Sequence, residues 1–176
     1  APLRFVELGP GRGTLMADAL RATRSGPGFQ DAATIELVET SPRLEALQRS
    51  KLAGCGRPTT WHRTSESVPD GPAIILANEF FDALPVRHYV RGTAGWHERI
   101  VGLGDGGALV FGAAPEPIEI VAAFGTPGQM LEVGHAALRT MATLAARIAR
   151  DGGVLLVCDY GHAETALGET PQAVAR

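Results

Sequence analysis

The sequence predicts an α/β fold: a mostly parallel sheet with helices on both faces and an antiparallel β insertion. Apolar runs typical of buried strands, at 3–8, 34–38 and 73–77, alternate with helical patterns, as in sheets built from crossover connections. Residues 86–117 differ, because they hold short strand-like pieces separated by glycine-rich turns. We therefore expect residues 1–176 to form one domain in which 86–117 is the β-rich insertion.

Residues that typically start or stop helices define two helices in the first half of the sequence. Over residues 14–24, apolar residues recur at helical spacing and predict a helix, which Gly26-Pro27-Gly28 stops. Ser41 can cap a second helix with Pro42 in its first turn, and Gly54 ends the leucine stripe of that helix. The order strand, helix, strand, helix favours parallel pairing of the strands.

The remaining elements follow the same patterns. A brief strand is expected at 59–62, and the purely apolar run 73–77 indicates a central strand buried on both faces. Residues 130–133 form a short extended piece. The clearest helical stripe covers 135–150, and another fully apolar strand follows at 154–158.

Composition and charge exclude several classes of protein. The 176 residues suffice for one soluble domain with a core, and the net charge of −3 without a basic run argues against a nucleic-acid partner. Two distant cysteines and five dispersed histidines predict a reduced setting and no metal site. No run approaches the roughly 18 apolar residues of a membrane span, so membrane insertion is not expected.

The stretch FVELGPGRGTL at residues 5–15 predicts a cofactor-binding turn between a strand and a helix. Gly9, Gly11 and Gly13 would let a ligand approach the main chain, where the unpaired N–H groups of the helix start lie. A dinucleotide fingerprint would place its third glycine at Thr14. With Glu7 beside the turn, a ligand with ammonium and sulfonium charges suits the site better than a pyrophosphate. Packing alone is the alternative explanation for the glycines.

Two further acidic positions follow predicted strands. Glu39 ends the second strand, where a carboxylate can accept hydrogen bonds from both ribose hydroxyls of a nucleoside. A solvent-facing acid before a helix start is the alternative for Glu39. In NEFFDALP, the residues after the strand at 73–77, Glu79 and Asp82 would share a face if the segment turned helically. Together they could hold a guanidinium and align its nitrogen with a methyl donor. Alternatively, Asp82 caps a turn.

ELGPGRGTL, LVETSPRL, NEFFDALPV and DYGH, in this order, resemble the MidA family of protein arginine methyltransferases. The resemblance runs from Phe5 to about His162. It implies a class I methyltransferase (Rossmann-like) fold, S-adenosyl-L-methionine as donor and, for mitochondrial relatives, an arginine of a respiratory complex I subunit as acceptor, in a role that assists complex I assembly. Carried over by position, it implies that the methionine end is held by Glu7, Gly9, Gly11 and Gly13, the ribose by Glu39, and that the transferred methyl is bordered by Asn78 and Glu79.

Three functions therefore compete at this point. The first is a methyltransferase acting on a protein arginine, with Asn78, Glu79 and Asp82 at the catalytic end of the site. The second is a cofactor-binding assembly factor without turnover, and the third is a small-molecule methyltransferase. Because the chain opens two residues before its first strand, we also expect a partial domain. A bacterial, cytoplasmic protein is the simpler expectation, with the mitochondrial matrix for a eukaryotic relative.

Overall fold

The computed structural model describes residues 2–119, 125–161 and 167–168. His162, the last residue of the DYGH motif, lies outside them. The chain divides into two compact units, which consist of residues 1–83 with 138–160, and of residues 84–137 with 161–176. Each unit has its own sheet, and each is described by itself below.

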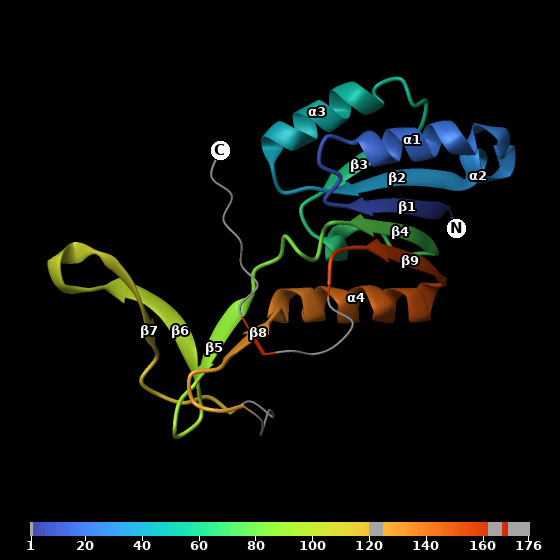
Figure 1. Cartoon of the computed structure of the whole chain (residues 1–176). Helices are drawn as coiled ribbons and strands as arrows, with labels where there is room; N and C mark the ends of the chain where they lie inside the picture. The colour runs from blue at the N-terminus through green and yellow to red at the C-terminus, as the bar shows by residue number, and fades with distance from the viewer. Residues whose placement is uncertain (1, 120–124, 162–166, 169–176) are drawn as a thin grey trace. The chain divides into compact units, whose positions relative to one another are not determined.

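The first unit is built on a five-stranded parallel sheet (Figure 1). Its strands are β1 (Leu3–Leu8), β2 (Ala33–Val38), β3 (Thr59–His62), β4 (Ala73–Asn78) and β9 (Gly153–Cys158). Their order across the sheet is β3-β2-β1-β4-β9. The chain thus builds outward from β1 in one direction and then, from β4, in the other. The carboxyl ends of β1 and β4 form the point at which strand order reverses, where α/β sheets usually bind ligands.

Helices cover both faces of this sheet, as the sequence predicts (Figure 1). On one face lie α1 (Thr14–Ala22), the short α2 (Pro27–Ala32) and α3 (Pro42–Leu52), and on the other lies α4 (His135–Asp151). The two faces carry separate apolar cores, because alternate residues of a strand point to opposite sides. Met16 and Leu20 of α1 pack on one of them, and Leu144 of α4 packs on the other.

The helix expected at 14–24 ends earlier than predicted. It stops at Ala22, and a 3₁₀ turn at Thr23–Ser25 leads into α2. The sequence did not predict α2. Pro27 explains the difference: its fixed φ suits the first turn of a helix, so Gly26-Pro27-Gly28 ends one helix and begins another. Phe29 of α2 then packs edge-on against Phe5, with ring centroids 5.4 Å apart.

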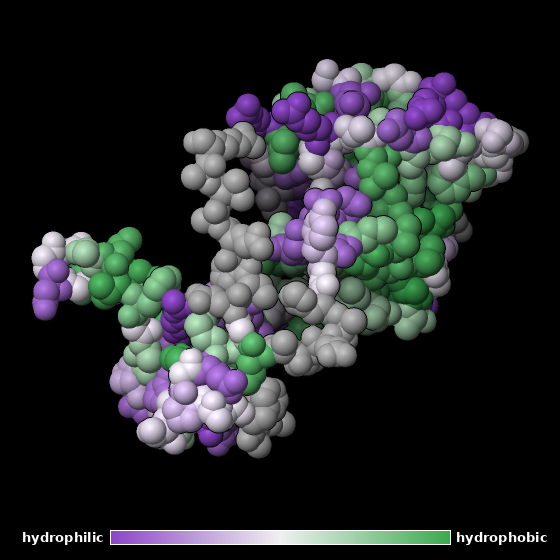
Figure 2. Space-filling model, viewed as in Figure 1, coloured by the Kyte–Doolittle hydropathy of each residue, from purple (hydrophilic) through white to green (hydrophobic). Residues whose placement is uncertain are grey.

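The second unit contains a four-stranded antiparallel sheet of order β7-β6-β5-β8. Its strands are β5 (Arg87–Arg91), β6 (Trp96–Leu103), β7 (Leu109–Ala113) and β8 (Met130–Val133). Trp96 and Tyr89 are buried, whereas the β6–β7 hairpin exposes apolar side chains such as Phe111. Figure 2 shows green, hydrophobic surface on this hairpin. Two further 3₁₀ turns lie at Ser65–Ser67, in the first unit, and at Asp105–Gly107, in the second. None of the described helices is both long and apolar enough to cross a membrane.

Candidate cofactor and acceptor site

The parallel sheet brings the predicted site residues to one edge. In register, Leu8 of β1 pairs with Val38 of β2 and with Ala77 of β4, so the segments after these three strands emerge side by side. The N–H of Gly9 donates to the carbonyl of Val38 at 3.0 Å, which ties the glycine turn to the end of β2. Asn78, the last residue of β4, is paired with Cys158 of β9.

All three glycines of the turn adopt left-handed backbone conformations, with φ of +61° at Gly9, +53° at Gly11 and +75° at Gly13. Two of them are also closely covered. A Cβ on Gly9 would stand 3.0 Å from the ring of Phe80, and one on Gly13 would stand 3.3 Å from Cγ of Gln48. A Cβ on Gly11 would meet no atom of the described residues within 4 Å. The turn is therefore packed at both ends and open at Gly11.

Glu7 lies under this turn, with only 3% of its surface exposed. Its carboxylate accepts a hydrogen bond from the backbone N–H of Met16 in α1, while Oε2 has no hydrogen-bond partner among the described residues. Burial raises the pKa of Glu7 to about 7, and the Met16 hydrogen bond only partly opposes this shift. A buried carboxylate with an unused oxygen is suited to bind a cationic group of a ligand.

Glu39 is also buried, at 7% exposure, so the solvent-facing alternative for this residue is wrong. The first residues of the β2–α3 connection hold it: Oε1 accepts the backbone N–H of Ser41 at 2.8 Å. Oε2 accepts the side-chain amide of Gln48 at 3.0 Å. Each oxygen has one donor, which leaves further lone pairs for ligand hydroxyls.

Sequence reasoning missed Gln48. This residue of α3 is fully buried, and besides Glu39 it binds the carbonyl of Gly11 through Nε2 at 2.8 Å and the indole N–H of Trp61 through Oε1 at 2.9 Å. A glutamine among the leucines and charged residues of this helix gives no sequence signal. Its position, nearly two turns inside the helix that Ser41 caps, places it behind the glycine turn. Trp61 is thus a hydrogen-bond partner of Gln48, and Arg49 stacks on the Trp61 ring at 3.9 Å.

At the end of β4 and just beyond it, the side chains of Asn78, Glu79 and Asp82 are exposed. The segment is a series of bends and turns, so the helical face expected for Glu79 and Asp82 does not form. Glu79 instead has φ +46°, and its N–H donates to the carbonyl of Cys158 at 2.8 Å. A left-handed non-glycine residue is a strained feature of the kind that gathers at functional sites.

Asp159, the acidic residue of the DYGH motif at the end of the last strand, also shapes this segment. Oδ2 of Asp159, just beyond β9, accepts the backbone N–H groups of Phe81 at 2.8 Å and Asp82 at 3.3 Å. Phe80 and Phe81 lie edge-to-face with centroids 5.3 Å apart and pack against the core under β4. The turn that carries Glu79 and Asp82 is thereby fastened to two strands.

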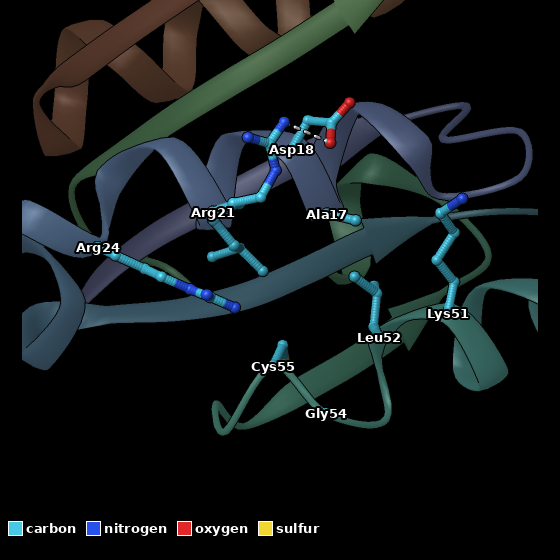
Figure 3. Close-up of a pocket in the computed structure, with 9 residues that line it drawn as sticks. Ala17, Asp18, Arg21, Arg24, Lys51, Leu52, Gly54 and Cys55 are labelled. Carbon is cyan, nitrogen blue, oxygen red and sulfur yellow. Dashed lines mark hydrogen bonds and ion pairs between the residues drawn. The ribbon is translucent and has the colours of Figure 1, made fainter.

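A hollow of about 330 Å³ lies between the ends of α1 and α3 (Figure 3). Its lining includes Arg24, Lys51 and Cys55, and Figure 3 shows Arg21 turned toward Asp18, with which it pairs at 3.0 Å. None of the predicted site residues lines the hollow.

Comparison with known proteins fits this geometry. A family model described as "Putative S-adenosyl-L-methionine-dependent methyltransferase" matches residues 1–176. The chain belongs to this family. The resemblance drawn from the motifs and the predicted fold class are both confirmed.

Relatives within this methyltransferase family include the mitochondrial protein arginine methyltransferase NDUFAF7. The zebrafish (Danio rerio) protein is 36% identical over 91% of this chain and 44% of its own length, and the human protein 34% over 90% and 42%. A crystal structure from Burkholderia thailandensis bound to S-adenosyl-homocysteine is 28% identical, with a TM-score of 0.69, over 83% of this chain and 39% of that one. This chain thus spans less than half the length of these relatives.

Proposed function

We propose that this chain forms the S-adenosylmethionine-binding part of a methyltransferase whose acceptor is an arginine of a protein. One observation carries the proposal: two buried carboxylates, Glu7 and Glu39, flank an open glycine turn at the point where strand order reverses. Family membership supports it, as do the names of the NDUFAF7 relatives and the S-adenosyl-homocysteine in the Burkholderia structure.

The residues present suit S-adenosylmethionine. The unused oxygen of Glu7 suits the cationic methionine end, and the space at Gly11 lets a ligand approach the main chain. Glu39 has lone pairs for the ribose hydroxyls. When bound, S-adenosylmethionine supplies a methyl group that its sulfonium makes electrophilic. Asn78 and Glu79, at the end of the neighbouring strand β4, would border that methyl group.

On the acceptor side, residues of this chain bind and orient the guanidinium of the arginine. Glu79 and Asp82 are exposed carboxylates, which can accept charge-assisted hydrogen bonds from a guanidinium. Such binding fixes the direction of one nitrogen toward the methyl donor, and alignment supplies much of what a methyl transfer requires. The bonds from Phe81 and Asp82 to Asp159 keep the turn in place for this task.

The proposal extends to the identity of the protein that supplies the arginine. From the MidA resemblance we propose a respiratory complex I subunit for mitochondrial relatives, consistent with the mitochondrial naming of the vertebrate proteins. For a bacterial form of this chain we propose a cytoplasmic protein acceptor. Mass spectrometry of methylated arginines in cells with and without the gene would identify the acceptor in either case.

The decisive experiment compares wild type with Glu79→Gln in a radiolabelled methyl-transfer assay on protein acceptors, alongside calorimetric titration with S-adenosylhomocysteine. We expect Glu79→Gln to bind S-adenosylhomocysteine like wild type and to lose at least about a hundredfold in transfer. Glu116→Gln, an exposed carboxylate outside the motif, is the control and should behave as wild type. Binding of S-adenosylhomocysteine without transfer to any protein would instead support the non-catalytic assembly factor or a small-molecule acceptor.

A further inference from the structure

The chemistry of its neighbours fixes the orientation of the Gln48 side-chain amide. An indole N–H can only donate, so the amide atom facing Trp61 is the oxygen. The carbonyl of Gly11 and the carboxylate of Glu39 can only accept, so the NH₂ group faces both of them. A flipped amide would lose all three hydrogen bonds inside a fully buried site.

This orientation gives each hydrogen of the NH₂ group a separate task. One hydrogen bond holds the carbonyl of Gly11, in the open part of the turn, and the other holds Oε2 of Glu39. The opposite oxygen of Glu39 is held by Ser41, so the carboxylate cannot rotate without breaking a bond at one end. Gln48 therefore connects the part of the site assigned to the methionine end with the part assigned to the ribose.

We infer that Gln48 is a positioning residue that orients the Glu39 carboxylate for a ribose and thereby makes the site select ribonucleosides over deoxyribonucleosides. The inference rests on the proposed function, because it takes the ligand of this edge to be S-adenosylmethionine. A carboxylate already held by two donors loses little freedom when it accepts ribose hydroxyls, and this preorganisation favours binding. A ligand without the 2′-hydroxyl leaves one of those lone pairs unused.

The test uses Gln48→Glu, titrated calorimetrically with S-adenosylhomocysteine and with its 2′-deoxyribose analogue. A glutamate at position 48 can still accept the indole N–H of Trp61, but when ionised it cannot donate to Gly11 or Glu39. We expect it to weaken S-adenosylhomocysteine binding by roughly tenfold or more and to weaken the 2′-deoxy analogue less, so that the preference for ribose falls.

Two other variants serve as a control and as a replacement for Gln48→Glu. Trp61→Phe removes the third hydrogen bond but leaves both donations to the site, and it should keep the wild-type preference for ribose. Gln48→Met is similar in length and adds no buried charge, so it replaces Gln48→Glu if the latter fails to fold. It too should lower the preference for ribose.

The outcomes separate this inference from the proposed function. A folded Gln48 variant with the wild-type preference for ribose, or one that weakens both ligands equally, overturns the positioning role. Failure of folded wild-type protein to bind S-adenosylhomocysteine at all overturns the proposed function itself. A fall in the ribose preference with Gln48→Glu, absent with Trp61→Phe, supports the inference.

Discussion

Asp159 and Phe81 are 78 positions apart in the sequence, yet Oδ2 of Asp159 accepts the backbone N–H of Phe81 at 2.8 Å. The same oxygen accepts the N–H of Asp82, while Oδ1 accepts that of Tyr160. One carboxylate after β9 therefore fastens the turn after β4. The acceptor carboxylates that we propose depend on a residue that is far away in the chain.

Removing the Asp159 carboxylate should weaken activity toward the protein acceptor without weakening cofactor binding. We expect Asp159→Ala to lower kcat/KM for the protein acceptor by about tenfold to a hundredfold, because the turn with Glu79 and Asp82 loses its anchor. The affinity for S-adenosylhomocysteine should stay within about twofold of wild type. Tyr160→Phe is the control, since the Tyr160 side chain is largely exposed. Equal losses in donor and acceptor binding would contradict this division of roles.

The open position in the glycine turn predicts loss of ligand binding by a bulky side chain. Gly11→Val should abolish detectable binding of S-adenosylhomocysteine, because the new side chain fills the space beside the main chain. Gly56→Val is a matched control: Gly56 also has a positive φ and open space around it, but it lies in the loop after α3. Both variants should lose a similar free energy of unfolding, and only Gly11→Val should lose binding. Equal binding by both would show that the ligand does not contact the turn.

At Gly9, where the ring of Phe80 covers the glycine turn, a larger side chain should lower the stability of the fold. Gly9→Ala must adopt φ +61° and also displace the ring of Phe80 from a 3.0 Å contact. We expect a loss of about 2–3 kcal/mol in the free energy of unfolding, measured by urea denaturation. Gly54→Ala has no such contact among the described residues and should change stability by less than about 0.5 kcal/mol. A Gly9→Ala variant as stable as Gly54→Ala would refute the close approach of Phe80.

Glu7 predicts a pH dependence of stability with a defined sign. Its pKa is raised from 4.5 to about 7 in the folded protein, so between these values the folded state binds more protons than the unfolded state. Stability therefore falls as pH rises from about 4.5 to 7, by on the order of 3 kcal/mol from this residue. Glu7→Gln should remove this contribution to the pH dependence of stability and leave the contributions of other residues unchanged.

The same pKa predicts the pH dependence of ligand binding. A cationic ligand group beside Glu7 favours the ionised carboxylate, so the affinity for S-adenosylhomocysteine should rise between pH 5.5 and pH 7.5. In Glu7→Gln this rise should be absent and affinity should be low throughout. Calorimetry in buffers of different ionisation enthalpy would detect the proton released on binding. Binding independent of pH in wild type would place the cationic group elsewhere.

The sequence predicted most of the first unit because its signals are local. The apolar run of β1, the cap at Ser41 and the apolar run of β4 each specify an element from neighbouring residues alone. The short helix α2, which begins at Pro27, was not predicted, because a proline can both end one helix and begin another. Glu7 and Glu39 could be proposed because strand ends in parallel sheets converge.

The sequence by itself determined the kind of turn, the acids beside it and the family, since these depend on residue types at short spacing. Only the tertiary structure decided that Gln48 holds Gly11 and Glu39 together, and that Asp159 holds the turn after β4. The physical reason is that a buried polar group must find its hydrogen-bond partners in space, and pairs 37 or 78 positions apart leave no mark on local sequence pattern.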